Sequence, residues 1–281
     1  MSDTLPGPLV DTDWLAAHLG HVMVFDATKF LPNQNRDGRA EYLAAHIPGA
    51  GYFDIDAIAD ADTDLPHMVP APGRFAKLVG ALGIGNDSAV IFYDNNDMMW
   101  ASRAWWMLGT FGHDNAAVLD GGLAKWRAEG RPVEAGTPPA PTPATFRPDF
   151  RARHLRGIGD MLRNVRTQDE LVLDARGAPR FHAQVPEPRA GMRSGHIPGS
   201  ANLPYADLLT EAKTLRPSAE LRARFAQAGV DGSRAVVTSC GSGVSATVLT
   251  LGMVLAGLPE GAVYDGSWTE WGGRPDTPIE T

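Results

Sequence analysis

Cysteine is almost absent from this chain, whose 281 residues include a single one, Cys240. One thiol excludes an intrachain disulfide and provides too few thiolates for a zinc ribbon or an iron–sulfur cluster. A free reactive thiol suits a reducing compartment. Because no targeting signal is evident, we expect a cytoplasmic location. Most free cysteines are buried and unreactive. A catalytic role for Cys240 therefore needs support from its surroundings.

Other common features are also missing. No apolar run approaches the roughly 18 residues that span a bilayer, and residues 1–6 lack the basic and apolar regions of a signal peptide. We find no G-x-G-x-x-G pattern, no Walker pattern and no metal-ligating cluster, so we expect no cofactor or metal. The formal net charge of −8 disfavours a nucleic-acid partner, which requires a basic face.

The neighbours of Cys240 favour reactivity. The β-branched run 235–238 predicts a strand before it, and residues 246–256 have helical spacing after it. Gly241 and Gly243 allow the intervening backbone to curl with its N–H groups inward. The start of the helix adds a partial positive charge. Both effects favour the thiolate, which is the reactive form of cysteine.

The chain contains an internal repeat. Four landmarks occur twice in the same order, and the members of each pair lie 145 to 150 residues apart. They begin at residues 24 and 172, 46 and 196, 89 and 235, and 118 and 263. We therefore predict two copies of one domain, residues 1–136 and 150–281, joined by a linker over 137–149 that is rich in proline.

Short apolar segments alternate with helical patterns in both copies. Strands are predicted at 22–25, 89–93, 116–119, 171–174, 235–239 and 262–264, and helices at 73–82, 102–111, 219–228 and 246–256. This alternation predicts an α/β fold in which each copy has a mainly parallel sheet covered by helices. Ligands bind such sheets at the carboxyl ends of strands, and Cys240 follows one.

The two copies differ at the position of the thiol. Asp94 in the first copy corresponds to Cys240 in the second. A carboxylate cannot replace a thiol as nucleophile and would repel an anionic substrate. We therefore expect the second copy to be catalytic and the first to contribute one wall of the cleft. The histidines of the paired His-Ile-Pro-Gly motifs, His46 and His196, occur in both copies, so we expect them to be structural.

The loop Cys-Gly-Ser-Gly-Val-Ser-Ala, the paired His-Ile-Pro-Gly motifs and the segment 265–271 together resemble the two-domain rhodanese-type sulfurtransferases, and most closely those that use 3-mercaptopyruvate. The resemblance extends from about residue 9 to residue 272. It departs from the family pattern at Ser245, where threonine is usual. Both side chains are hydroxyls, so we expect little change.

The resemblance implies a persulfide mechanism. The Cys240 thiolate would take sulfur from 3-mercaptopyruvate, release pyruvate, and pass the sulfur to an acceptor such as thioredoxin, a small thiol or cyanide. Backbone N–H groups of the loop, which comprises Gly241, Ser242, Gly243, Val244 and Ser245, would stabilise negative charge on the sulfur. Two arginines, Arg180 and Arg189, match the family's substrate-binding pair and suit a carboxylate.

A proton relay is also implied by the resemblance. Asp56, His67 and Ser242 occupy the positions of an Asp–His–Ser arrangement in similar enzymes. Such a relay requires the first copy to contribute to the second copy's site. The alternative is that Asp56 caps a helix and His67 lies in a surface loop.

Three other functions remain as alternatives. Thiosulfate sulfurtransferases typically carry basic side chains in the loop, whereas Gly241, Ser242 and Gly243 are uncharged, which favours 3-mercaptopyruvate. A related phosphatase would need an arginine six residues after the cysteine, where Ala246 stands. A module that senses sulfur or redox state without turnover would not require the arginines and the relay.

Overall fold

The computed structural model of the chain describes residues 4–31 and 34–281. They form two compact units. Unit 1 takes the residues up to Ala61 together with Val69–Arg151 and Ala212–Thr214, and unit 2 takes Asp62–Met68, Ala152–Glu211 and Leu215–Thr281. Each unit thus includes a short segment from the other half of the sequence.

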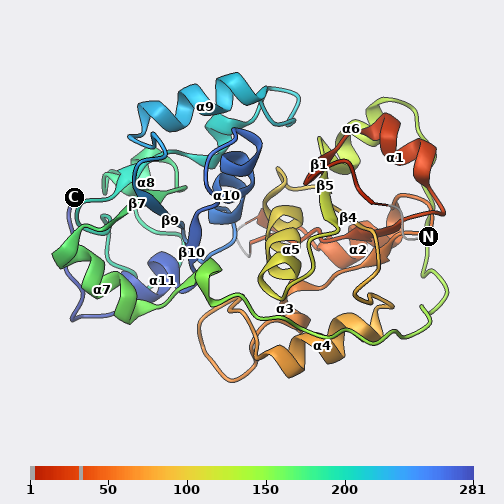
Figure 1. The fold of residues 1–281 in the computed structure, drawn as a ribbon, viewed down its shortest axis with the longest axis horizontal. Coiled ribbons are helices and arrows are strands. Elements are labelled where there is room, and N and C mark those ends of the chain that lie inside the picture. Colours follow the sequence, from red (N-terminus) through yellow and green to blue (C-terminus); the bar gives the residue numbers. More distant parts are fainter. Residues whose placement is uncertain (1–3, 32–33) are drawn as a thin grey trace. The chain divides into compact units, whose positions relative to one another are not determined.

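Unit 1 is built on a five-stranded sheet (Figure 1). Its strands are β1 (Leu9–Val10), β2 (Met23–Asp26), β3 (Gly51–Tyr52), β4 (Val90–Tyr93) and β5 (Ala116–Leu119), all parallel, in the order β1-β5-β4-β2-β3. Its helices are α1 (Thr12–His18), α2 (Gly38–Ala44), α3 (Ile55–Ile58), α4 (Pro72–Ala81), α5 (Met99–Thr110) and α6 (Gly122–Ala128).

Unit 2 repeats this topology. Its strands are β6 (Leu155–Arg156), β7 (Glu170–Asp174), β8 (Ala201–Asn202), β9 (Ala235–Ser239) and β10 (Ala262–Tyr264), all parallel, in the order β6-β10-β9-β7-β8. Its helices are α7 (Ile158–Thr167), α8 (Ala178–Phe181), α9 (Ser218–Gln227), α10 (Ala246–Leu255) and α11 (Ser267–Trp271), with 3₁₀ turns η2 (Ala152–His154) and η3 (Tyr205–Leu208). The predicted tandem of α/β domains with parallel sheets is confirmed.

The side chains of each strand alternate between two packed faces, as the pleat requires. In unit 1, Val24 and Ile91 pack with α1 and α6 through Leu15 and Trp126. The intervening Phe25 and Phe92 belong instead to an aromatic group with Phe53. In unit 2, one face forms a core with α7 and α11, whose members are Met161, Val172, Ile197, Val237, Tyr264, Trp268 and Trp271. Because both faces of each sheet are covered, its central strands read as nearly continuous apolar runs.

The proline-rich segment packs along unit 1. Ala144 donates its N–H to the carbonyl of Gly80 at 2.8 Å, and Asp149 donates to the carbonyl of Phe111 at 2.9 Å. Phe146, between them, is buried. The limits 1–136 and 150–281 for the two domains stay predictions. In the described part of the chain, no helix is both long and apolar enough to cross a membrane.

Candidate active site

Three loops converge at the carboxyl edge of the second sheet. They follow β7, β9 and β10, which are adjacent and parallel, with Asp174 paired to Ser239 and Thr238 paired to Val263. Parallel strands end at the same edge, so the residues that come next are neighbours. Cys240 follows β9 directly, and α8 and α11 start just after the other two strands.

The start of α11 holds the backbone of Cys240. The Cys240 N–H donates to Ser267 Oγ at 3.1 Å, and the Cys240 carbonyl accepts from the Trp268 N–H at 3.0 Å. Ser267 Oγ in turn donates to the carbonyl of Tyr264 at 2.7 Å. Ser267 has a φ of +49°, a conformation that non-glycine residues adopt at a cost and that marks a constrained turn. Cys240 itself is 2% exposed.

The loop after Cys240 is held by α11 and leaves several of its backbone N–H groups available. The Gly241 carbonyl accepts from the N–H and the hydroxyl of Thr269, at 2.8 and 2.6 Å, and Gly243 has a φ of +73°. Within residues 4–31 and 34–281, no protein acceptor takes the N–H of Ser242, Val244 or Ala246. These donors precede and begin α10, where the helix dipole also favours negative charge.

The first copy shows what this arrangement can hold. Asp94, buried after β4, accepts four backbone N–H bonds at 2.8 to 3.0 Å. The donors are Asn96, Met98, Trp100 and Ala101. Burial raises the pKa of the Asp94 carboxyl, and these four bonds oppose that rise. In unit 1 the loop is thus occupied by its own carboxylate.

The corresponding donors in the second copy, 146 residues later, belong to Ser242, Val244, Ala246 and Thr247. Only Thr247 is engaged there, with the carbonyl of Val244 at 3.1 Å. The cysteine side chain is one atom shorter than the aspartate side chain. The N–H groups that bind a carboxylate oxygen in the first copy are therefore available in the second copy to a thiolate or to an atom bonded to its sulfur.

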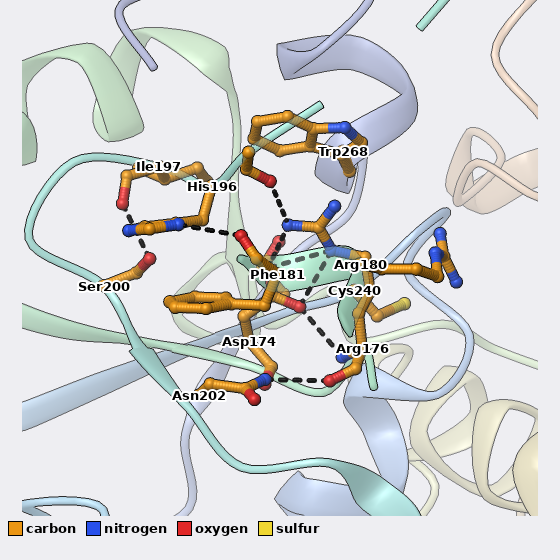
Figure 2. A network of polar contacts seen from close by, with 12 residues as sticks. Asp174, Arg176, Arg180, Phe181, His196, Ile197, Ser200, Asn202, Cys240 and Trp268 are labelled. Carbon is orange, nitrogen blue, oxygen red and sulfur yellow. Dashed lines mark hydrogen bonds and ion pairs between the residues drawn. The ribbon is translucent and has the colours of Figure 1, made fainter. Parts of the chain in front are cut away.

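Both predicted substrate arginines adjoin this loop. A Cβ added to Gly241 would lie 3.2 Å from Nη2 of Arg180, so that guanidinium packs against the loop. Figure 2 shows the side chains of Arg180 and Cys240 extending to the same side. Arg189 Nη1 donates to Thr269 Oγ1 at 2.8 Å, and that hydroxyl bonds to the carbonyl of Gly241.

A buried ionic network that the sequence did not predict is joined to Arg180 through Glu187. Arg176, whose side chain is 1% exposed, pairs with Asp174 at 2.7 Å, and its guanidinium lies 4.3 Å from the ring centre of Trp268 (Figure 2). Arg176 also pairs with Glu187 at 2.7 Å. Burial alone would lower the pKa of Arg176, but the two carboxylates outweigh it and the pKa is raised. The sequence signal was weak: an acid between two prolines, Pro186 and Pro188.

The structure places the relay candidates as follows. Ser242 is buried in the loop of unit 2, and His67, with a φ of +63° and 7% exposure, lies in the segment Asp62–Met68 that belongs to the same unit. Asp56 lies in α3 of unit 1, half-exposed and ion-paired with Lys29. The relay itself stays a prediction.

The alternative for these residues is wrong in both parts. The cap of α3 is Asp54, whose carboxylate accepts the N–H groups of Asp56 and Ala57 at 3.1 and 3.2 Å. Asp56 is therefore inside the first turn and does not cap the helix. His67 is buried rather than exposed on a surface loop.

The paired His-Ile-Pro-Gly motifs are held by backbone contacts in both units. The Nδ1 atoms of His46 and His196 lie 2.8 and 2.9 Å from the carbonyls of Tyr42 and Phe181. The glycine of each motif donates its N–H to a glutamate near the end of its copy, Glu134 or Glu280, at 3.0 Å. Each motif thus binds the segment near the end of its copy through these hydrogen bonds.

Comparison with known proteins gives relatives along nearly the whole chain. 3-Mercaptopyruvate sulfurtransferase of Escherichia coli K12 is 40% identical over 274 residues, covering 96% of this chain and 97% of that protein. Thiosulfate sulfurtransferase of Bos taurus is 39% identical over 272 residues, covering 94% and 91%. The crystal structure of SseA from Escherichia coli, described as a 3-mercaptopyruvate sulfotransferase with the rhodanese fold, superposes with a TM-score of 0.84 at 38% identity, covering 93% of this chain and 99% of the other.

The family model for the rhodanese-like domain matches twice, at residues 11–129 and 158–274. Each match includes four of the five strands of one sheet, leaving out β1 or β6, and the second match includes Cys240 and its loop. With this double match and the full-length relatives, the chain belongs to the rhodanese family and carries two rhodanese-like domains.

Proposed function

We propose that this chain is a 3-mercaptopyruvate sulfurtransferase in which Cys240 is the nucleophile. The observation that carries the proposal is the contrast between the two loops. Asp94 fills the first with its own carboxylate, while the second presents Cys240 and three backbone N–H groups that no acceptor among the described residues takes. The name of the E. coli relative supports this donor.

The first half-reaction loads the enzyme with sulfur. The Cys240 thiolate attacks the donor sulfur, a new S–S bond forms, and the C–S bond of mercaptopyruvate breaks with its electron pair going to carbon. The carbon then receives the proton that the donor's thiol gives up, so pyruvate leaves and Cys240 carries a persulfide anion. The N–H groups of Ser242, Val244 and Ala246 would stabilise that negative charge without reorganising.

The second half-reaction discharges the persulfide. An acceptor thiolate or cyanide attacks the outer sulfur, the S–S bond breaks, and its electron pair returns to Cys240 as thiolate. The two steps share no ternary complex, so double-displacement kinetics follow. We propose a thiol acceptor, such as thioredoxin or a small thiol, as the physiological partner, and a cytoplasmic location.

The donor's carboxylate and proton are assigned to named side chains. We propose that Arg180 and Arg189 bind the carboxylate, since a guanidinium offers a bidentate fork of the matching geometry. Asp56, His67 and Ser242 would carry the thiol proton to the carbon that leaves as pyruvate. The residues of the loop, from Gly241 to Ser245, would enclose the sulfur.

The second candidate is a thiosulfate sulfurtransferase, which the name of the bovine relative supports. The uncharged Gly241, Ser242 and Gly243 favour the monoanionic mercapto acid over a dianion. A comparison of kcat/KM for the two donors tests this. We expect the higher value with 3-mercaptopyruvate, and a higher value with thiosulfate would reverse the assignment.

A further inference from the structure

Arg180 does not act alone, because the buried carboxylate of Glu187 binds the Nε–Nη2 edge of its guanidinium. Glu187, whose side chain is 4% exposed, contacts Nε of Arg180 at 3.3 Å through Oε1 and forms an ion pair with Nη2 through Oε2. This bidentate contact uses one edge of the guanidinium. The edge that carries Nη1 is left for a ligand, and Nη2 adjoins Gly241.

The same glutamate also binds the second guanidinium. Oε1 of Glu187 accepts from Nη1 of Arg176 at 2.7 Å, and Arg176 is bound in turn to Asp174. Two arginines and two carboxylates therefore form one continuous network, whose formal charges cancel. Arg180, with its side chain 28% exposed, is the one member that solvent and substrate reach.

We propose that Glu187 is a positioning residue that sets donor selectivity: it orients Arg180 toward the Cys240 loop and cancels enough of its charge to favour a monoanionic donor over a dianionic one. The proposal rests on the function proposed above and adds the residue that distinguishes its two donors. Glu187 touches neither the donor nor the sulfur and acts through Arg180.

The physical reason is a difference in charge. A donor with one carboxylate brings one negative charge to Arg180, whereas thiosulfate brings two. The negative charge of Glu187 lies against the Nε–Nη2 edge of the guanidinium and repels both donors, but it repels the dianion twice as strongly. Its burial limits screening by salt, so this difference persists at physiological ionic strength.

Glu187→Gln tests the proposal, because it keeps the shape and removes the charge. We expect kcat/KM for thiosulfate to rise relative to that for 3-mercaptopyruvate by about tenfold, for one charge acting across a partly exposed guanidinium. The change should fall mainly on KM. A residue that served only to hold the fold would lower both values together and leave their ratio unchanged.

Glu170→Gln is the matched control. Glu170 also makes a bidentate ion pair, with Arg156, but it lies at the opposite end of β7 from Asp174. The control removes the same charge and the same kind of pair away from Cys240. Its donor ratio should equal that of the wild type, and an equal shift in both variants would overturn the proposal.

A second variant covers the case in which Glu187→Gln does not fold. Glu187→Asp keeps the buried charge opposite Arg176 but withdraws it from Arg180, so we expect a shift in the same direction of about threefold. An unchanged donor ratio in whichever variant folds overturns the inference and leaves the proposed function intact. Failure of the proposed function itself is seen separately, as absent turnover of 3-mercaptopyruvate by the wild type.

Discussion

Two equivalent buried aspartates, Asp26 in unit 1 and Asp174 in unit 2, show how one neighbouring residue changes a repeated site. Asp26 corresponds to Asp174, 148 residues later, and Thr28 corresponds to Arg176. The second copy thus pairs its carboxylate with a guanidinium, while in the first the donors to the carboxylate are Thr28 and Tyr93. Burial consequently raises the pKa of Asp26 to about 6.

The raised pKa of Asp26 predicts a pH-dependent stability. The folded state binds this proton more tightly than the unfolded state, so the free energy of unfolding falls as pH rises from about 4 to about 6, by up to about 3 kcal/mol. Asp26→Asn should remove that pH dependence, so the stability of the variant relative to the wild type should increase as pH rises. Denaturant unfolding at a series of pH values measures it, and parallel curves for the two proteins would refute the assignment.

Asp94 gives the second prediction at this scale. Asp94→Asn keeps the size of the side chain but leaves a single acceptor oxygen, whereas the four N–H groups now share two. We therefore expect the free energy of unfolding of unit 1 to fall by about 2 kcal/mol. Asp97→Asn in the same loop is the control. Asp97 pairs with Lys213 at the surface, and its loss should cost less than about 1 kcal/mol. Equal losses in the two variants would show that Asp94 does not hold the loop.

At the scale of elements, close helix packing depends on a glycine in α10. A Cβ at Gly252 would lie 2.8 Å from Leu208 Cδ1 and 3.3 Å from Phe225, so the helix approaches η3 and α9 closely there. Gly109 in α5 has open space at the same position of its side chain. The two sites have the same helix propensity and opposite steric surroundings.

We therefore predict opposite effects for the same substitution. Gly109→Ala should raise the free energy of unfolding by up to about 1 kcal/mol, since alanine favours the helix. Gly252→Ala should lower it by about 1 to 2 kcal/mol, because overpacking outweighs that gain. Thermal unfolding of both variants measures the pair. A stabilised Gly252→Ala would show that η3 and α9 yield to the extra methyl group.

The sequence predicted the long elements well and the short ones poorly. All six predicted strands and four predicted helices exist, with ends shifted by three residues at most. Two-residue strands such as β1 and β3 were missed because two residues establish no periodicity. Helix α11 was missed as an element for a related reason: its five residues begin at Ser267, whose positive φ gives no composition signal.

At the scale of the whole molecule, duplication made the candidate site predictable. The repeat aligns Asp94 with Cys240 in the sequence, and the resemblance selects Arg180 and Arg189. Glu187 was not predictable in the same way. Its role depends on contacts with two arginines seven and eleven residues away, which only the folded backbone brings together.

The most direct test of the account is the loading of Cys240 with sulfur. Intact-mass spectrometry after exposure to 3-mercaptopyruvate, without an acceptor, should show a gain of one sulfur atom per chain and release of one equivalent of pyruvate. Because Cys240 is the only cysteine, Cys240→Ser should show neither and still fold. Pyruvate release by Cys240→Ser, or an unmodified wild-type chain after turnover begins, would contradict the central claim.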